Sequence, residues 1–116
     1  MNGFDDRAKA FEAKFHVDEE IAFKTRARRD RLLGLWVAGK LGLQGDQADA
    51  YARNLVDIAL ADAERAAMLA KVRADLAAAH SAVSEAALRA EIDRCDALAR
   101  RQIMGETGDG KLTVSP

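Results

Sequence analysis

Residues that interrupt helices are confined to a few places in this chain of 116 residues. The one proline is Pro116, and no glycine stands between Asp46 and Met104. From Phe4 to Leu41 the sequence is rich in alanine, lysine, glutamate, arginine and leucine, which all favour helix. No segment shows the alternation of apolar and polar residues that is typical of a strand. We therefore expect an all-α protein, and its length allows one domain with a modest core.

Glycines and capping residues divide the chain into four expected helices. Three glycines should end a long first helix: Gly39, Gly42 and Gly45. Three residues are suited to cap the N-termini of the later helices: Asp46, Asp62 and Ser84. The last helix should end before Gly105, and residues 105–116 have no helical period and are expected to be disordered. The expected fold is a four-helix bundle with a long first helix.

Apolar residues recur at helical spacing and predict which side chains form the core. The stripe of the first helix consists of Ile21, Leu32, Leu35 and Trp36. The stripes of the later helices are Ala48, Tyr51, Leu55, Ile58 and Ala59; then Leu69, Val72, Leu76 and Ala79; and finally Leu88, Ile92, Cys95, Ala99 and Ile103. We expect Trp36 to anchor the core and Cys95 to be a buried thiol.

A separate apolar stripe lies at the N-terminus, where four residues share one helical face: Phe4, Ala8, Phe11 and Phe15. This stripe ends at Asp18 and Glu19, and apolar residues are sparse beyond it. We therefore expect a joint or a frayed region near residues 16–20. Two interpretations stay open. The phenylalanines either pack on the bundle, or they form a helical ligand, mobile or loosely docked when free, that binds a groove on a partner.

Charge and composition exclude several classes of protein. The formal net charge is −1, so no overall field attracts the chain to nucleic acid or to a membrane surface. The apolar runs are far shorter than the roughly 20 residues that a membrane span requires. Charged residues stand where a signal peptide would have its apolar stretch. The single cysteine excludes an intramolecular disulfide. We expect a soluble, cytoplasmic protein that does not insert into a membrane.

No motif for catalysis or metal binding is present. There is no glycine-rich phosphate loop and no CxxC pair. The two histidines, His16 and His80, lack the spacing of metal ligands and are expected at solvated positions or helix ends. Acidic pairs such as Asp93 and Asp96 are typical of a helix surface. We predict no catalytic residue, no metal site and no required cofactor.

The stretch KTRARRDR, residues 24–31, concentrates five bases and one acid. One interpretation is a contact with phosphate, on a nucleotide or on nucleic acid. The other is a solvated helix surface whose bases pair with the acids of residues 18–20, for example Lys24 with Glu20. No aromatic residue within the stretch is available to stack on a base, which argues against nucleic acid.

Two segments together, FDDRAKAFEAKF and DEEIAFKTRARRDRLLGLWVAGKLG, closely resemble the alphaproteobacterial zeta subunit, an inhibitor of the F-type ATP synthase. The resemblance is specific from Phe4 to Gly42 and looser to about residue 104. It implies an antiparallel four-helix protein with no turnover of its own. It also implies the division of the chain into an inhibitory segment 1–18, a four-helix domain 19–104 and a tail 105–116.

The resemblance further implies a mechanism in which the N-terminal helix enters a catalytic interface between alpha and beta subunits, beside the gamma subunit of the central stalk. Rotation in the direction of hydrolysis would then be blocked, at the cytoplasmic face of the inner membrane. The residues that would contact the synthase are Phe4, Asp5, Asp6, Arg7, Phe11, Glu12 and Phe15. Family members are also associated with adenine nucleotides, but no motif here assigns residues to one.

The chain departs from the family pattern at three positions. His16 and Val17 replace the usual alanine and histidine, so no pH-sensing role is carried over. Asp30 stands where asparagine is common. Two alternative functions stay open beside inhibition. One is a regulatory module that binds an adenine nucleotide through the basic stretch 24–31, and the other is a helical scaffold or assembly protein.

Overall fold

The computed structural model describes residues 3–62 and 64–108; within these, it leaves out the side chains of residues 4–8, 10–13, 15 and 107. Four helices make up the structure: α1 (Gly3–Lys40), α2 (Gly45–Ala61), α3 (Ala66–Ala78) and α4 (Glu85–Gly108). The described residues contain no strand. The expected all-α fold with four helices is therefore confirmed.

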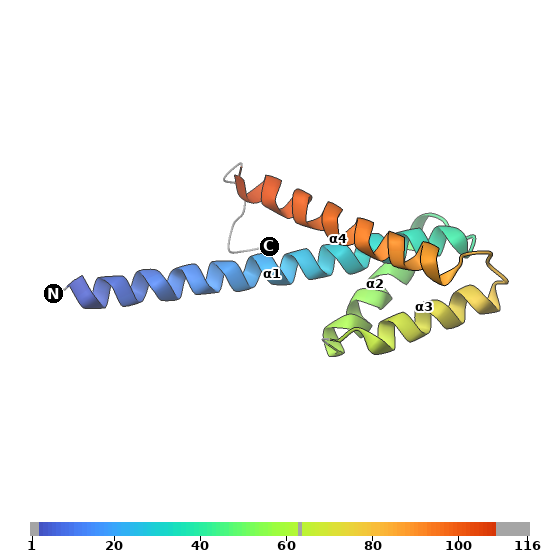
Figure 1. Ribbon diagram of the computed structural model, residues 1–116, viewed down its shortest axis with the longest axis horizontal. Coiled ribbons are helices and arrows are strands. Elements are labelled where there is room, and N and C mark those ends of the chain that lie inside the picture. Colours follow the sequence, from blue (N-terminus) through green and yellow to red (C-terminus); the bar gives the residue numbers. More distant parts are fainter. Residues whose placement is uncertain (1–2, 63, 109–116) are drawn as a thin grey trace.

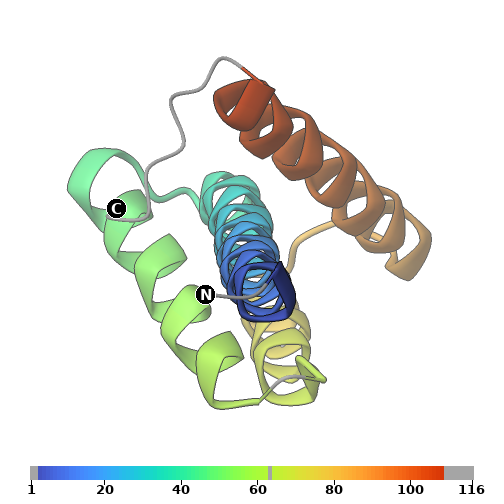
Figure 2. The ribbon, with the colours of Figure 1, turned by 90° about the vertical axis from the view of Figure 1, so that its left-hand side faces the viewer.

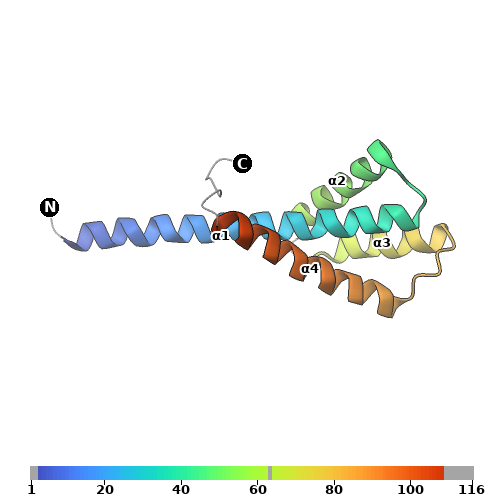
Figure 3. The same cartoon turned by 90° about the horizontal axis from the view of Figure 1, so that it is seen from above.

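Helix α1 is the axis of the molecule, and successive helices run in opposite directions (Figure 1). Seen along its length, α1 lies between α2 and α4, with α3 on a third side (Figure 2). The other helices surround only its C-terminal part. Its N-terminal part projects well beyond them, as the view from above also shows (Figure 3). This projection gives the molecule a length of 66 Å against widths of 27 and 24 Å.

The expected joint near residues 16–20 is wrong, because α1 is one continuous helix through this region. The reason lies in the backbone. Residues 16–20 include no glycine or proline, so each backbone N–H can donate to the carbonyl four residues earlier. This bond does not depend on where the apolar side chains lie. The apolar stripe changes its position on the helix surface without interrupting the helix.

Glycine ends α1 in the expected way. Gly42 has a φ of +81°, the left-handed conformation that glycine adopts without strain. Its N–H donates to the carbonyl of Gly39 at 3.2 Å, and the N–H of Leu43 donates to the carbonyl of Ala38 at 2.9 Å. These two bonds form a Schellman motif, which satisfies carbonyls that the helix end leaves open.

The predicted N-terminal caps have different outcomes. Asp46 is not the cap of α2, because the cap position is Gln44. Asp46 lies in the first turn, where its negative charge interacts favourably with the helix dipole. Asp62 is not at the cap position of α3, which is Arg65. Its carboxylate nevertheless accepts the N–H of Ala67, in the first turn of α3, at 3.1 Å. Ser84 caps α4, and its hydroxyl accepts the N–H of Ala87 at 3.0 Å.

The core lies between the C-terminal half of α1 and the other three helices. Its largest fully buried side chains are Leu33, Leu55, Met68, Leu88, Ile103, Val37, Val72 and Cys95. The predicted stripes of α2 and α4 contribute to it much as expected. In α3 Met68 is buried and Ala79 is exposed, so the stripe there begins earlier than expected.

In α1 the predicted stripe is displaced by one residue. Leu33 and Val37 are fully buried, whereas Leu35 is half-buried and lies outside the core cluster. Trp36 is half-buried at the edge of the core, with the Lys40 ammonium 5.4 Å from the centre of its ring. The tryptophan therefore packs against the core, as expected, but it does so from the edge and is not one of the fully buried side chains.

The end of α4 also differs from the expectation. The helix continues through Gly105 to Gly108, so the predicted disorder is wrong for residues 105–108. Residues 109–116, which make up the rest of the predicted tail, lie outside the described residues. No described helix is long and apolar enough to cross a membrane.

Candidate functional site

The projecting part of α1 contains every residue predicted to contact a partner. The helical backbone includes Phe4, Asp5, Asp6, Arg7, Phe11, Glu12 and Phe15, but their side chains lie outside those that the structure describes. The described side chains of this segment, Lys9 and Lys14, are exposed. All four residues from 16 to 19 are exposed as well, and partial burial begins at Glu20.

The basic stretch lies where α1 meets the end of α4. Lys24 pairs with Glu20 at 3.5 Å, as the sequence predicted. The Arg28 guanidinium donates to Gln102 Oε1 at 2.7 Å and to Glu106 Oε1 at 3.1 Å. These bonds fasten the last turns of α4 to α1. The stretch is therefore only partly the solvated surface that the second interpretation expected.

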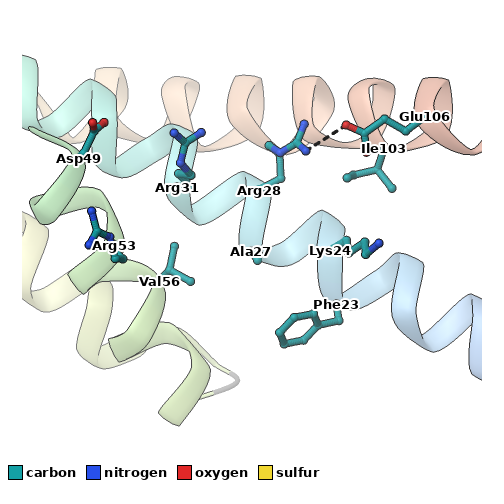
Figure 4. Close-up of a pocket in the computed structure, with 10 residues that line it drawn as sticks. All are labelled: Phe23, Lys24, Ala27, Arg28, Arg31, Asp49, Arg53, Val56, Ile103 and Glu106. Carbon is teal, nitrogen blue, oxygen red and sulfur yellow. Dashed lines mark hydrogen bonds and ion pairs between the residues drawn. The ribbon is translucent and has the colours of Figure 1, made fainter. Parts of the chain in front are cut away.

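A cavity of about 570 Å³ opens between α1 and α2 beside these residues (Figure 4). Four cations line it: Lys24, Arg28 and Arg31 from α1, and Arg53 from α2. Two acids, Asp49 and Glu106, lie at its margins, and its apolar wall consists of Phe23, Ala27, Val56 and Ile103. Among the residues that the structure describes, neither Arg31 nor Arg53 forms an ion pair. Cations beside an apolar wall suit a ligand that has both an anionic and an apolar part.

Sequence reasoning identified the basic stretch but missed the contribution of α2. Arg53 is the one basic residue in DAYARNLV, and it lies on the exposed side of α2. Nothing in its local sequence distinguishes it from an ordinary surface arginine. Only the packing of α2 against α1 brings it to the same cavity as Arg28 and Arg31.

A buried ion pair fixes α1 against the turn between α2 and α3. Asp30 is 3% exposed, and its Oδ1 accepts a bond from Arg65 Nη2 at 2.6 Å. Arg29 Nε donates to the same oxygen at 3.0 Å. Arg65 itself has a φ of +65°, which a residue other than glycine rarely adopts. Asp30 thus holds its carboxylate between two arginine partners.

The buried thiol of Cys95 is unsuited to nucleophilic chemistry. It is fully buried, and its Sγ donates to Glu91 Oε2 at 3.4 Å. Burial and the bond to the Glu91 carboxylate raise the pKa of Cys95 to about 12. The thiolate, which is the reactive form, is therefore scarce at neutral pH. The expectation of a buried structural cysteine is confirmed.

The two histidines do not come together. His16 is exposed on the projecting part of α1, and His80 is exposed at the end of α3. The described residues include no group of three or more histidine, cysteine, aspartate or glutamate side chains that could hold a metal ion.

One long helix extends beyond the bundle, and a cation-lined cavity lies beside it; both features are suited to binding other molecules. A family model described as ATPase inhibitor subunit zeta matches residues 1–102. The chain therefore belongs to the zeta family of ATPase inhibitors, and its role is inhibitory and connected with the ATP synthase. Searches among curated proteins and among solved structures returned no match.

Proposed function

We propose that the chain inhibits ATP hydrolysis by inserting the N-terminal part of α1 into a catalytic interface between the alpha and beta subunits, beside the gamma subunit. The residues that would contact the synthase are those of segment 1–18, chiefly Phe4, Phe11 and Phe15. A rigid helix there would block rotation in the hydrolysis direction. The chain would act as a regulator at the cytoplasmic face of the inner membrane, without chemistry of its own.

One observation supports this proposal above the others. Helix α1 continues well beyond the bundle, and every described side chain of residues 9–19 is exposed. Exposed helix without a place in the core is suited to a groove on another protein. Family membership favours inhibition over the alternative of a general scaffold.

ATP hydrolysis by the purified ATP synthase of the source organism tests the proposal directly. We expect added protein to lower the hydrolysis rate, and deletion of residues 1–15 to abolish this effect while the bundle keeps its helical circular dichroism. A deletion variant that inhibits as well as the full chain would contradict insertion of α1. It would also transfer the inhibitory role to the bundle.

The cavity between α1 and α2 supports a second function, the binding of an adenine nucleotide. Its volume of about 570 Å³ is in the range of small-molecule sites. Arg31 and Arg53 would contact the phosphates, and Phe23 and Val56 would contact the base. This pairing of apolar and cationic walls is the observation that favours a nucleotide over a plain anion.

Titration with ATP, followed residue by residue by NMR, tests the second function. We expect chemical shift changes to concentrate at the cavity, and the Arg31→Ala and Arg53→Ala variants to bind about tenfold more weakly or worse. Arg101→Ala, on α4, removes an exposed arginine that does not line the cavity and serves as the control. Shift changes spread over the whole surface, equal in all variants, would refute a nucleotide site here.

A further inference from the structure

A second depression adjoins the first, between α1, α2 and the turn that leads to α3. Its volume is about 220 Å³, and it shares Phe23, Ala27 and Val56 with the larger cavity. The residues that distinguish it are Ala59 and Leu60 at the end of α2, three arginines and Asp30. The depression therefore has an apolar floor and a cationic margin of its own.

The apolar floor is unusually open to solvent. Phe23 is 46% exposed and Leu60 is 57% exposed, and both line this depression. Single exposed apolar residues are common on protein surfaces and require no explanation. Two large apolar side chains that converge from different helices onto one depression form a contiguous patch, which is typical of an interaction site.

The margin carries a strong local charge. Arg26, Arg29 and Arg65 line the depression together with a single acid, Asp30, in a chain whose formal net charge is −1. Asp30 holds Arg29 and Arg65 in place, so their guanidinium groups need little ordering when a partner approaches. Arg26 is exposed and forms no ion pair with any residue that the structure describes.

We propose that this depression, formed around Phe23, Leu60 and Arg26, is a docking site for an acidic amphipathic helix of a partner protein. The inference rests on the proposed function, in that the partner belongs to the catalytic head of the ATP synthase. An apolar stripe on the partner helix covers Phe23 and Leu60, and carboxylates beside that stripe face the arginines. Apolar anchors would supply most of the binding energy, and the charges would supply orientation and speed of association.

The position of the depression suits a second contact to the same partner. Phe23 lies eight residues after Phe15 on the same helix, a distance of about 12 Å at 1.5 Å per residue. One partner can thus contact the projecting part of α1 and the depression at once. Two linked contacts bind more tightly than either alone, because the second forms within the same complex.

Binding of the full-length chain to the purified catalytic head, measured at low and at physiological salt, tests this inference. We expect Leu60→Asp to weaken binding about tenfold or more. Arg26→Glu should weaken binding mainly at low salt and reduce its dependence on salt. The matched controls are Met104→Asp, which changes a residue of α4 that is also 57% exposed, and Arg101→Glu, which changes an exposed arginine of α4. Both controls should bind within about twofold of wild type.

The outcomes separate this inference from the proposed function. If wild type binds and inhibits, and Leu60→Asp and Arg26→Glu behave like wild type, the docking site is wrong and the inhibitory proposal stands. If wild type does not bind the head at all, both are overturned. A parallel titration with duplex DNA tests the alternative that this cationic surface binds a polyanion. Tight binding of DNA that Arg26→Glu abolishes would overturn the docking site in favour of a polyanion site.

Discussion

Gly34 on α1 and Ala52 on α2 lie so close that no methyl group fits between them. A Cβ built on Gly34 would lie 2.6 Å from the Cα of Ala52 and 3.0 Å from its Cβ. Both distances are shorter than an ordinary van der Waals contact. The two helices therefore meet backbone to backbone, and this contact sets the separation of α1 and α2 at the cavity described above.

Gly34→Ala should destabilise the fold although alanine is the better helix former. The gain in helix propensity is about 1 kcal/mol, whereas forcing atoms into a packed contact costs typically about 1–3 kcal/mol. The obstacle is backbone, which cannot rotate away as a side chain can. We expect a lower melting temperature in thermal denaturation. As a control, Gly39→Ala adds a methyl group on the same helix, where nothing lies within 4 Å. It should leave the melting temperature unchanged or raise it.

Leu33 and Leu35 provide a comparison of one residue type at two positions of α1. Leu33 is fully buried in the core, and Leu35 is half-buried outside the core cluster. Leu33→Ala should cost about 2–5 kcal/mol, and Leu35→Ala clearly less. Urea denaturation of the two variants measures both values. Equal losses would mean that the stripe predicted from the sequence, with Leu35 in the core, was correct after all.

This comparison also shows how far the sequence could predict the fold. Glycines predicted the end of α1, whereas the divisions between α2, α3 and α4 followed from apolar periodicity and capping residues. Gly42 and Ser84 act at the helix ends as their chemistry predicts. The sequence did not predict which face of α1 is buried in the core. Leu32, Leu33, Leu35 and Trp36 are all apolar, and their periodicity fits either choice of face. The close contact at Gly34 decides it, since only glycine admits α2 there.

The candidate site was less predictable than the fold, for a physical reason. The basic stretch was visible because its charges are neighbours in sequence. Arg53, Leu60 and Arg65 join it only through the packing of α2 and the turn after it. Each of the three is an ordinary residue in its local context. Their common position is a property of the tertiary structure.

His80 occupies a position at the end of α3 that favours glycine. Its φ is +54°, its N–H donates to the carbonyl of Ala77, and the N–H of Ser81 donates to that of Leu76, as in a Schellman motif. His80→Gly should therefore raise the stability by about 1 kcal/mol, because the left-handed conformation costs other residues about that much. Ala79→Gly is the control, since Ala79 has a negative φ of −85°. It should lower the stability in the same urea titration.

Glu91 should make the stability depend on pH. The bond from Arg94, with Nε to Oε1 at 2.9 Å, holds the pKa of the Glu91 carboxyl below its usual value, although burial opposes this. A carboxyl whose pKa is lowered by folding stabilises the folded state above its unfolded pKa, and this contribution is lost as the pH falls through the folded pKa. Stability should thus decline as the pH falls below about 5.

Two variants test the role of Glu91 in that decline. Glu91→Gln cannot titrate, and Arg94→Ala removes the largest cause of the lowered pKa. Both should show a shallower loss of stability between about pH 6 and pH 3 than wild type. Melting temperatures recorded across this range give the comparison. Three parallel curves would assign the acid sensitivity to other carboxyl groups.

Phe11 and Phe15 should be the anchors of inhibition. Phe11→Ala and Phe15→Ala should each weaken inhibition of ATP hydrolysis about tenfold or more, or about 1.4 kcal/mol, because a few large side chains supply most of an interface's energy. Glu12→Lys, which changes a residue off the stripe, should weaken binding mainly at low salt. Lys14→Ala changes an exposed side chain of the same segment and should have little effect. Full inhibition by both alanine variants would contradict the insertion mechanism.

The continuity of α1 has one more consequence, which concerns the cost of ordering. An isolated peptide of the length of the projecting segment would be a marginal helix, because its first turn must fix several residues for a single hydrogen bond. In this chain that first turn already exists within the bundle, and the N-terminal segment extends it residue by residue toward Gly3. A partner that binds the segment therefore meets only the small cost of propagation. The part of α1 within the bundle thus acts as the helix nucleus from which the N-terminal segment propagates.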